Sequence, residues 1–269
     1  MEYIARPLPP LNPDMDVSQN HYWSYHSLPA LLACKKPLTA SQDEDLFIAV
    51  HQVCEIAFHQ MILDLDRTLE AFRIALADER DPICGDASET VYFLDRAVAL
   101  WRTVNTTMPI LTGLRAFAEF RSSIGPTSGF QSVQFRRIEI MSGVKKPFWA
   151  GGTRDAQGQI HVAETEFDRL YGADIAHWFK RYAAHSLAAY AETLAARRLV
   201  APHDASEPLV GLLRAYEQAQ QTFHRSHLKL AVVQLKKVGV EIGTGGTSFK
   251  DYLATYETEI APLFPGLGG

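Results

Sequence analysis

Residues 41 to 77 carry the pattern that most constrains the fold of this chain. Apolar side chains recur there every three or four positions, a period that is typical of one face of an α-helix. The members of the series are Phe47, Val50, Cys54, Phe58, Met61, Leu65, Leu69 and Phe72. Ser41 and Glu44, three residues apart, predict a capping box at the start of the helix. We therefore expect a core helix of about nine turns.

The rest of the chain repeats the helical period in shorter segments. Further helices are predicted over residues 89–108, 130–141, 173–199, 209–239 and 249–264. Pro109 is expected to end or bend the first of these. Loops are predicted at residues 78–87, 121–129, 142–172 and 239–248. Alternation with period two is rare and best at 158–164, so the fold class is all-α, a helical bundle.

Composition limits the compartment and the partners. The 269 residues have a net charge of −5, which gives no reason to expect nucleic acid or an anionic membrane as a partner. Three cysteines without metal-type spacing cannot pair into a closed disulfide framework, so a reducing cytoplasm is expected. We predict neither a signal peptide nor a membrane span. Residues 1–20 hold four prolines and are predicted to form an arm, with residues 21–269 as a single domain.

The glycine-rich stretch GTGGTS, residues 243 to 248, is typical of a loop that contacts a ligand. Backbone N–H groups of such a loop can converge on a phosphate, but a phosphate-binding loop needs Lys directly after its last glycine. Here Thr247 and Ser248 follow instead, and a predicted helix precedes the loop. A helix exit with a mobile lid, or a purely structural turn, fits the stretch better than phosphate binding.

Three polar residues stand where the pattern predicts apolar ones. His51 shares a face with Phe47 in the first helix, either as a hydrogen-bonded core histidine or as a residue that contacts a ligand. His227 lies on an apolar helix face suited to a metal or haem iron, and His224, one turn earlier, competes for that role. Zinc is not expected, because no third ligand completes a tetrahedral set. Arg121 is either a surface arginine or a group that binds a carboxylate.

The aromatic cluster HYWSYHS, residues 21 to 27, has two interpretations. Its rings are compatible with plain core packing. Tyr22, Trp23 and Tyr25 are also the kind of wall that a flat substrate needs.

Several of these segments together resemble the haem-dependent tryptophan 2,3-dioxygenases. FRSSIGPTSGFQSVQFRRIE resembles the arginine-bearing segment of that family, and DLFIAVHQVCEIAFHQ is similar to its distal helix. GTGGTS is similar to its substrate loop, and YWSYHSLPALL resembles its Y-x-x-Y-L segment, with His26 in place of the leucine. RSHL followed by GTGGT resembles the indoleamine 2,3-dioxygenase pattern and favours His227 over His224. The motifs span residues 22 to about 250 in the order of the family.

The resemblance implies a bundle enclosing haem b and a role for each matching residue. His227 is implied as the axial ligand of the iron, and His51 as the residue that faces the indole N–H. Arg121 is implied to hold the substrate carboxylate. The other implied contacts are Thr244 with the ammonium group, Ser128 and Gly243 with the haem, and Phe47, Tyr22, Tyr25 and His26 around the indole.

The resemblance also implies an assembly and a reaction. The family assembles as a dimer of dimers, so the two tyrosines are expected to come from a neighbouring subunit of a homotetramer. The substrates implied are dioxygen and L-tryptophan or a close derivative, and the product is N-formylkynurenine. The alternative is a monooxygenase that makes a 2-oxindole in secondary metabolism, which His26 would favour as an extra proton donor. Two hypotheses from other functional classes stay open: a haem sensor or carrier without oxygenase activity, and a purely structural helical scaffold.

Overall fold

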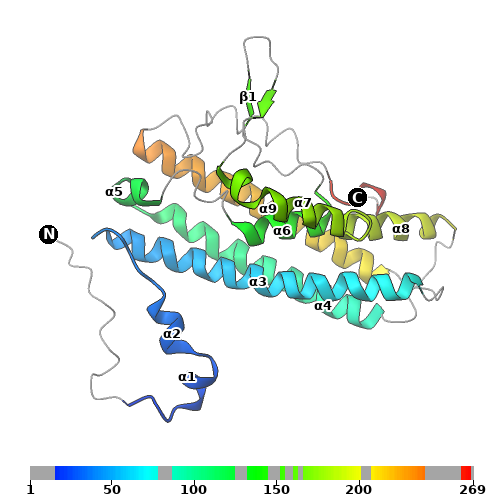
Figure 1. The fold of residues 1–269 in the computed structure, drawn as a ribbon, viewed down its shortest axis with the longest axis horizontal. Helices are drawn as coiled ribbons and strands as arrows, with labels where there is room; N and C mark the ends of the chain where they lie inside the picture. Colours follow the sequence, from blue (N-terminus) through cyan, green and yellow to red (C-terminus); the bar gives the residue numbers. More distant parts are fainter. Residues whose placement is uncertain are drawn as a thin grey trace.

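The centre of the computed structural model is α3, Gln42–Ala77, the longest helix of the bundle (Figure 1). The structure describes residues 16–77, 87–124, 132–144, 152–154, 160–162, 166–200, 207–239 and 262–267. Over Gln42–Ile74, α3 is long and apolar enough to cross a membrane by length and composition alone. The central helix of a bundle meets the same criteria, and α3 packs along α4, Ala87–Thr107, and α6, Val133–Ser142.

Two further helices complete the long layer of the bundle. α4 packs against α3 on one side and against α9, Glu207–Val238, on the other. The Asn105 side chain of α4 donates to the Ala219 carbonyl of α9 over 2.9 Å. After α4, the 3-10 helix η1, Met108–Gly113, carries Pro109 in its first turn, and Lys237 Nζ binds the Thr112 carbonyl near its end at 2.9 Å. These bonds fix the rotation of α9 relative to α4.

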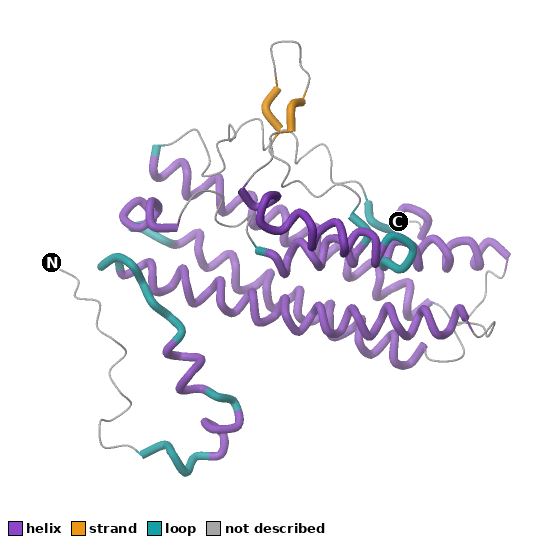
Figure 2. Tube along the Cα trace, in the orientation of Figure 1, coloured by secondary structure: helices purple, strands orange, loops and turns teal. Residues whose placement is uncertain are grey.

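Short elements cover the other side of α3 and α9. α5, Phe117–Phe120, and the 3-10 helix η2, Arg121–Ile124, lead toward α6. α7, Glu166–Tyr182, packs on α6, and α8, Leu187–Val200, packs on α6, α9 and the terminal 3-10 helix η4, Pro265–Leu267. Strands β1, Gly152–Arg154, and β2, Ile160–Val162, form an antiparallel hairpin that projects from this side (Figure 2).

Four rings from four helices form the middle of the core. Phe58 of α3, Trp101 of α4, Phe135 of α6 and Phe223 of α9 lie with ring centroids 5.1–6.3 Å apart. We call these four residues the aromatic core. Each is buried, and each ring removes about 150–250 Å² from water, so the cluster joins all four helices at one level.

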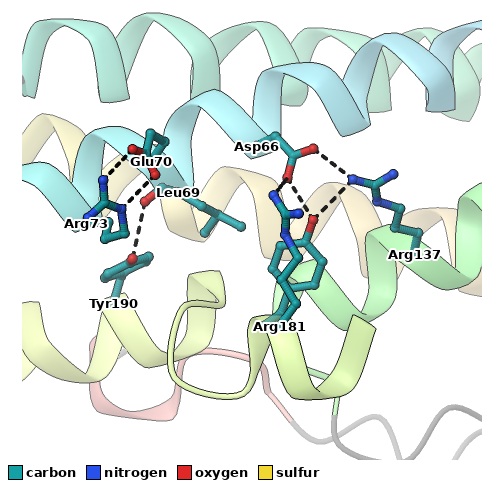
Figure 3. A network of polar contacts seen from close by, with 8 residues as sticks. Asp66, Leu69, Glu70, Arg73, Arg137, Arg181 and Tyr190 are labelled. Carbon is teal, nitrogen blue, oxygen red and sulfur yellow. Dashed lines mark hydrogen bonds and ion pairs between the residues drawn. The ribbon is translucent and has the colours of Figure 1, made fainter. Parts of the chain in front are cut away.

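A polar network ties α3 to α6 and α7 along one side (Figure 3). The Asp66 carboxylate accepts hydrogen bonds from Arg137 of α6 at 2.8 Å and from the Tyr182 hydroxyl of α7 at 2.7 Å. Arg181 lies 3.9 Å from the same carboxylate. One turn along α3, the Leu69 carbonyl accepts from the Tyr190 hydroxyl of α8. These contacts set the position of the short helices, and therefore of α6, relative to α3.

The segment before α3 stands away from the bundle (Figure 1). α1, His21–Tyr25, begins at Asn20, whose side chain accepts from the backbone N–H groups of its first turn. α2, Leu28–Ala33, follows after Ser27. Neither helix has a buried residue. Core packing, one of the two interpretations of the aromatic cluster, is therefore wrong within this chain.

The all-α prediction is confirmed, and three local predictions change. The predicted capping box is wrong: the Glu44 carboxylate accepts from the Leu38 and Thr39 N–H groups at 2.9 and 2.7 Å. Ser41 Oγ, although buried, has no hydrogen-bond partner among the described residues. The predicted helix over 173–199 is split into α7 and α8, and the predicted loop at 142–172 contains the hairpin and the start of α7.

The split between α7 and α8 has a local cause. Ser186 precedes α8 and its hydroxyl accepts from the Ala189 N–H at 3.3 Å, so it caps a new helix in the middle of the predicted one. The helix predicted at 249–264 lies almost entirely outside the described residues. The division into an arm and a domain at residue 20 stays a prediction, since the structure describes the arm only from residue 16.

Candidate functional site

The site is built around two histidines on different helices. α3 carries His51 and α9 carries His227, and the two rings are close enough for His51 to affect the pKa of His227. Burial, with His51 and Arg136 as smaller causes, lowers the pKa of His227 to about 4. Burial likewise lowers the pKa of His51. Both imidazoles are therefore neutral near pH 7, which is the form that binds a metal or accepts a hydrogen bond.

The ring of His227 lies on the aromatic core. It stacks on Phe223, one turn earlier in α9, with centroids 5.8 Å apart and planes only 13° apart. Phe223 in turn contacts Trp101, Phe58 and Phe135. The ring of His227 is thus packed against the aromatic core through Phe223.

A hydrogen bond fixes the tautomer of His51. Its Nδ1 lies 2.8 Å from the carbonyl oxygen of Phe47, one turn earlier in α3. A carbonyl can only accept, so Nδ1 carries the proton. Because the ring is neutral, Nε2 is unprotonated and can accept a hydrogen bond from a ligand N–H.

Aromatic side chains wall the space beside His51. Phe47 lies 4.2 Å from the His51 ring and contacts Phe120 at 5.4 Å and Phe117 at 6.1 Å. Phe120 is buried at the end of α5, and Arg121 follows it directly as the first residue of η2. The structure therefore brings His51, Phe47 and the backbone of half-buried Arg121 to the same end of the bundle.

The second histidine of α9 has a different environment. His224 Nε2 lies 3.7 Å from Glu139 Oε1 of α6, and its ring lies 5.4 Å from Phe135. Burial lowers the pKa of His224 to about 3. His224 therefore contacts α6, whereas His227 is near α3. The choice of His227 over His224 as the residue that binds a ligand stays a prediction.

The remaining predicted site residues either stand away from the bundle or lie outside the described residues. Tyr22 and Tyr25, 65% and 85% exposed, stand on α1 away from the bundle, with the ring of His26 against theirs at 4.7 and 5.0 Å. Ser128, Gly243 and Thr244 lie outside the described residues. Among the residues that are described, no three His, Cys, Asp or Glu side chains gather as a metal site.

Sequence reasoning missed several residues of the site. Phe117 and Phe120 are the ring partners of Phe47, and a signal for them was present, since they precede Arg121 at positions −4 and −1. Glu139, the neighbour of His224, left no signal in the helical pattern, because a buried carboxylate on an apolar helix face is an exception to that pattern.

Comparison with known proteins finds relatives that share one name. The family model described as tryptophan 2,3-dioxygenase matches residues 11–154. A tryptophan 2,3-dioxygenase of Nocardioides sp. is 30% identical over 262 residues, 93% of this chain and 94% of that protein. Proteins of the same name from Anaeromyxobacter sp. (strain K) and Ruegeria sp. are 28% and 27% identical, each over 91% of this chain and at least 90% of their own length.

The fold and the comparisons together define an all-α oxidoreductase. This chain belongs to the tryptophan 2,3-dioxygenase family. The match covers both the arginine-bearing segment and the helix that carries His51.

Proposed function

We propose that this protein is a haem-dependent oxygenase that inserts both atoms of dioxygen into the indole ring of L-tryptophan and forms N-formylkynurenine. The observation that carries the proposal is the convergence of His51 and His227, both neutral, from α3 and α9 in a chain of this family. A structural scaffold has no need of two neutral histidines brought near each other from different helices.

The described residues fit haem b. Iron in a porphyrin needs one axial protein ligand, and His227 is a neutral imidazole whose orientation is set by Phe223. When bound, ferrous haem supplies the open coordination position and the electronic activation that dioxygen needs to react with an indole. Resemblance to the family adds Ser128 and Gly243 as haem contacts.

His51 has the tautomer that an indole substrate requires. The indole N–H is a donor only, and the unprotonated Nε2 of His51 is an acceptor. A hydrogen bond between them would orient the ring with its reactive C2 and C3 edge toward the oxygen site, while Phe47 packs against the ring face. The same Nε2 can hold the indole proton if it is released during the reaction.

Arg121 and Thr244 are proposed to hold the charged ends of the amino acid. Arg121 is half-buried at the start of η2, next to the ring wall formed by Phe47, Phe117 and Phe120. A guanidinium there can bind a carboxylate through two parallel hydrogen bonds. The role of Thr244 with the ammonium group rests on resemblance. A haem sensor or carrier would need neither contact, so the enzyme is the better reading.

Exposed apolar side chains support assembly into a homotetramer. Tyr22 and Tyr25 are largely exposed on α1, so they can complete the pocket wall of a second copy together with His26. The outer face of α3 also exposes apolar residues at intervals of seven and three, namely Leu46, Val53, Ile56 and Leu63. This spacing suits a helix–helix contact between copies. Cys34 and Cys54 are free thiols, which agrees with a cytoplasmic location.

The test is the reaction of the haem-loaded protein with tryptophan under ¹⁸O₂. A ring-opened product that carries two labels is expected. A closed-ring oxindole with a single label, increased by ascorbate or peroxide, would replace the proposal with monooxygenation. That alternative is not favoured, since the relatives reported above are named dioxygenases. The absence of a Soret band after haem addition would refute the hypothesis that this protein binds haem.

A further inference from the structure

His224 and its neighbours on α6 carry an inference that rests on the proposed function. α9 holds two neutral histidines three residues apart, His224 and His227. At 3.6 residues per turn their side chains leave the helix only about 60° apart. Both are chemically able to bind haem iron, so something outside α9 has to decide which of them does.

The two rings have different neighbours. His227 is stacked on Phe223 and is near His51 of α3. His224 is directed at α6, where Glu139 Oε1 lies 3.7 Å from its Nε2 and the Phe135 ring lies 5.4 Å away. The two histidines therefore have neighbours on different helices, and the one directed at α6 is the one that lies beside a carboxylate.

That carboxylate is deeply buried with its own counter-charge. Glu139 is 3% exposed and Arg136 is 4% exposed, and Arg136 Nη1 donates to Glu139 Oε2 at 2.6 Å. Taking two charges out of water costs several kcal/mol per ion, and apolar residues of similar volume often serve stability as well or better. A contribution to stability therefore does not by itself explain why this ion pair is buried. Its second oxygen, Oε1, is the one near His224.

The carboxylate also selects the tautomer of His224. A neutral imidazole has one N–H, and a carboxylate attracts it because an ionised carboxylate only accepts. At 3.7 Å the contact is longer than a hydrogen bond, so it orients the ring by electrostatic attraction. Nε2, which then carries the proton, has no lone pair left for iron. His51 shows the opposite tautomer, with Nε2 free.

We propose that Glu139 is a positioning residue: by drawing the Nε2–H of His224 toward α6, it leaves His227 as the histidine of α9 that binds haem iron. Arg136 holds the Glu139 carboxylate in place and favours its ionised form, against the burial that raises the pKa of this carboxyl. The pair thereby decides which side of α9 presents a ligand.

The test follows haem release from the loaded full-length protein to an excess of a haem-scavenging protein. The unsubstituted protein and the matched control Glu192→Gln, on exposed α8 surface, are expected to release haem in one phase. Glu139→Gln is expected to add a second phase, because a neutral amide no longer holds the proton on Nε2 of His224, and the tautomer with a free Nε2 lone pair becomes accessible. Adding His224→Ala to Glu139→Gln should remove that phase.

A second measurement uses the loss of the ligand. His227→Ala alone is expected to show no Soret band, and Glu139→Gln in the same chain should restore one through His224. One release phase for Glu139→Gln at the unsubstituted rate would overturn the inference, as would a folded double variant without the band. If the unsubstituted protein shows no Soret band with haem, the proposed function fails first.

Discussion

Gly143 ends α6 in a backbone conformation that resists a side chain. Its φ of 106° lies in the left-handed region, and its N–H donates to the carbonyls of Glu139 and Ile140. A Cβ at this position would meet the Cβ of Ala188 on α8 at 2.4 Å and the Ser186 Oγ at 3.2 Å. Gly143→Ala therefore has to strain the backbone and also push α8 away from α6.

The two costs can be added from general magnitudes. An L-residue in the left-handed region costs about 1–2 kcal/mol, and inserting a methyl group into a packed contact costs about 1–3 kcal/mol. We expect the free energy of unfolding of Gly143→Ala to fall by about 2–5 kcal/mol. For a chain of this size, each kcal/mol shifts Tm by roughly 2–4 °C. The expected decrease in Tm is therefore about 10 °C.

Two other glycines separate these costs. Gly239 also has a positive φ, 68°, but nothing lies within 4 Å of its added Cβ, so Gly239→Ala should cost only about 1–2 kcal/mol. Gly211, inside α9 with open space around it, should gain up to about 1 kcal/mol on change to Ala. Urea unfolding followed by circular dichroism at 222 nm measures all three variants.

The ranking of the variants decides whether the reasoning holds. If Gly143→Ala costs no more than Gly239→Ala, α6 and α8 separate freely and the close contact with Ala188 has no energetic weight. A double-mutant cycle with Ala188→Gly tests the contact directly, since the two changes should couple by about 1–3 kcal/mol. Additive effects would assign the whole loss to backbone strain.

Arg121→Leu is expected to abolish tryptophan binding in a spectral titration while the Soret band stays unchanged; equal turnover of tryptamine and tryptophan by the unsubstituted protein would contradict this. Ile56→Glu, at an exposed position of α3, should shift the assembly to smaller species in analytical ultracentrifugation. An unchanged sedimentation profile would show that this face of α3 makes no contact between subunits. Asp66→Asn should cost about 1 kcal/mol in unfolding experiments, because its bonds to α6 and α7 lose their charge. Glu70→Gln, which breaks a pair exposed at both ends, should cost close to nothing, and similar losses for the two would refute the distinction. Burial lowers the pKa of His224 from 6.5 to about 3. Between these two pH values His224 therefore takes up a proton in the unfolded chain but not in the folded one. Stability of the haem-free protein should therefore fall on acidification, and His224→Gln should make the fall shallower by up to about 1.4 kcal/mol per pH unit.

The helices of this protein follow from local sequence. The period of three or four over 41–77 and 209–239 gave α3 and α9 nearly to the residue, because a helical face is set by neighbours within two turns of the same chain. His51, His227 and Arg121 were recognisable for the same reason, as polar residues that break an otherwise apolar or well-ordered pattern. Resemblance to the family supplied their expected roles, and the structure adds the proximity of the first two.

Tertiary structure decided what depends on residues far apart in the chain. The displaced capping box is a local exception: the Glu44 carboxylate accepts from the N–H groups of Leu38 and Thr39, only a few residues before it. The contact of Glu139 with His224 joins two helices whose relative rotation no local pattern specifies. Likewise, the sequence of an aromatic segment such as residues 21 to 27 does not show whether the segment packs into the core of its own chain or stands outside that core. Only the packing of the helices distinguishes these cases, because burial depends on which surfaces meet and not on the order of residues along one segment.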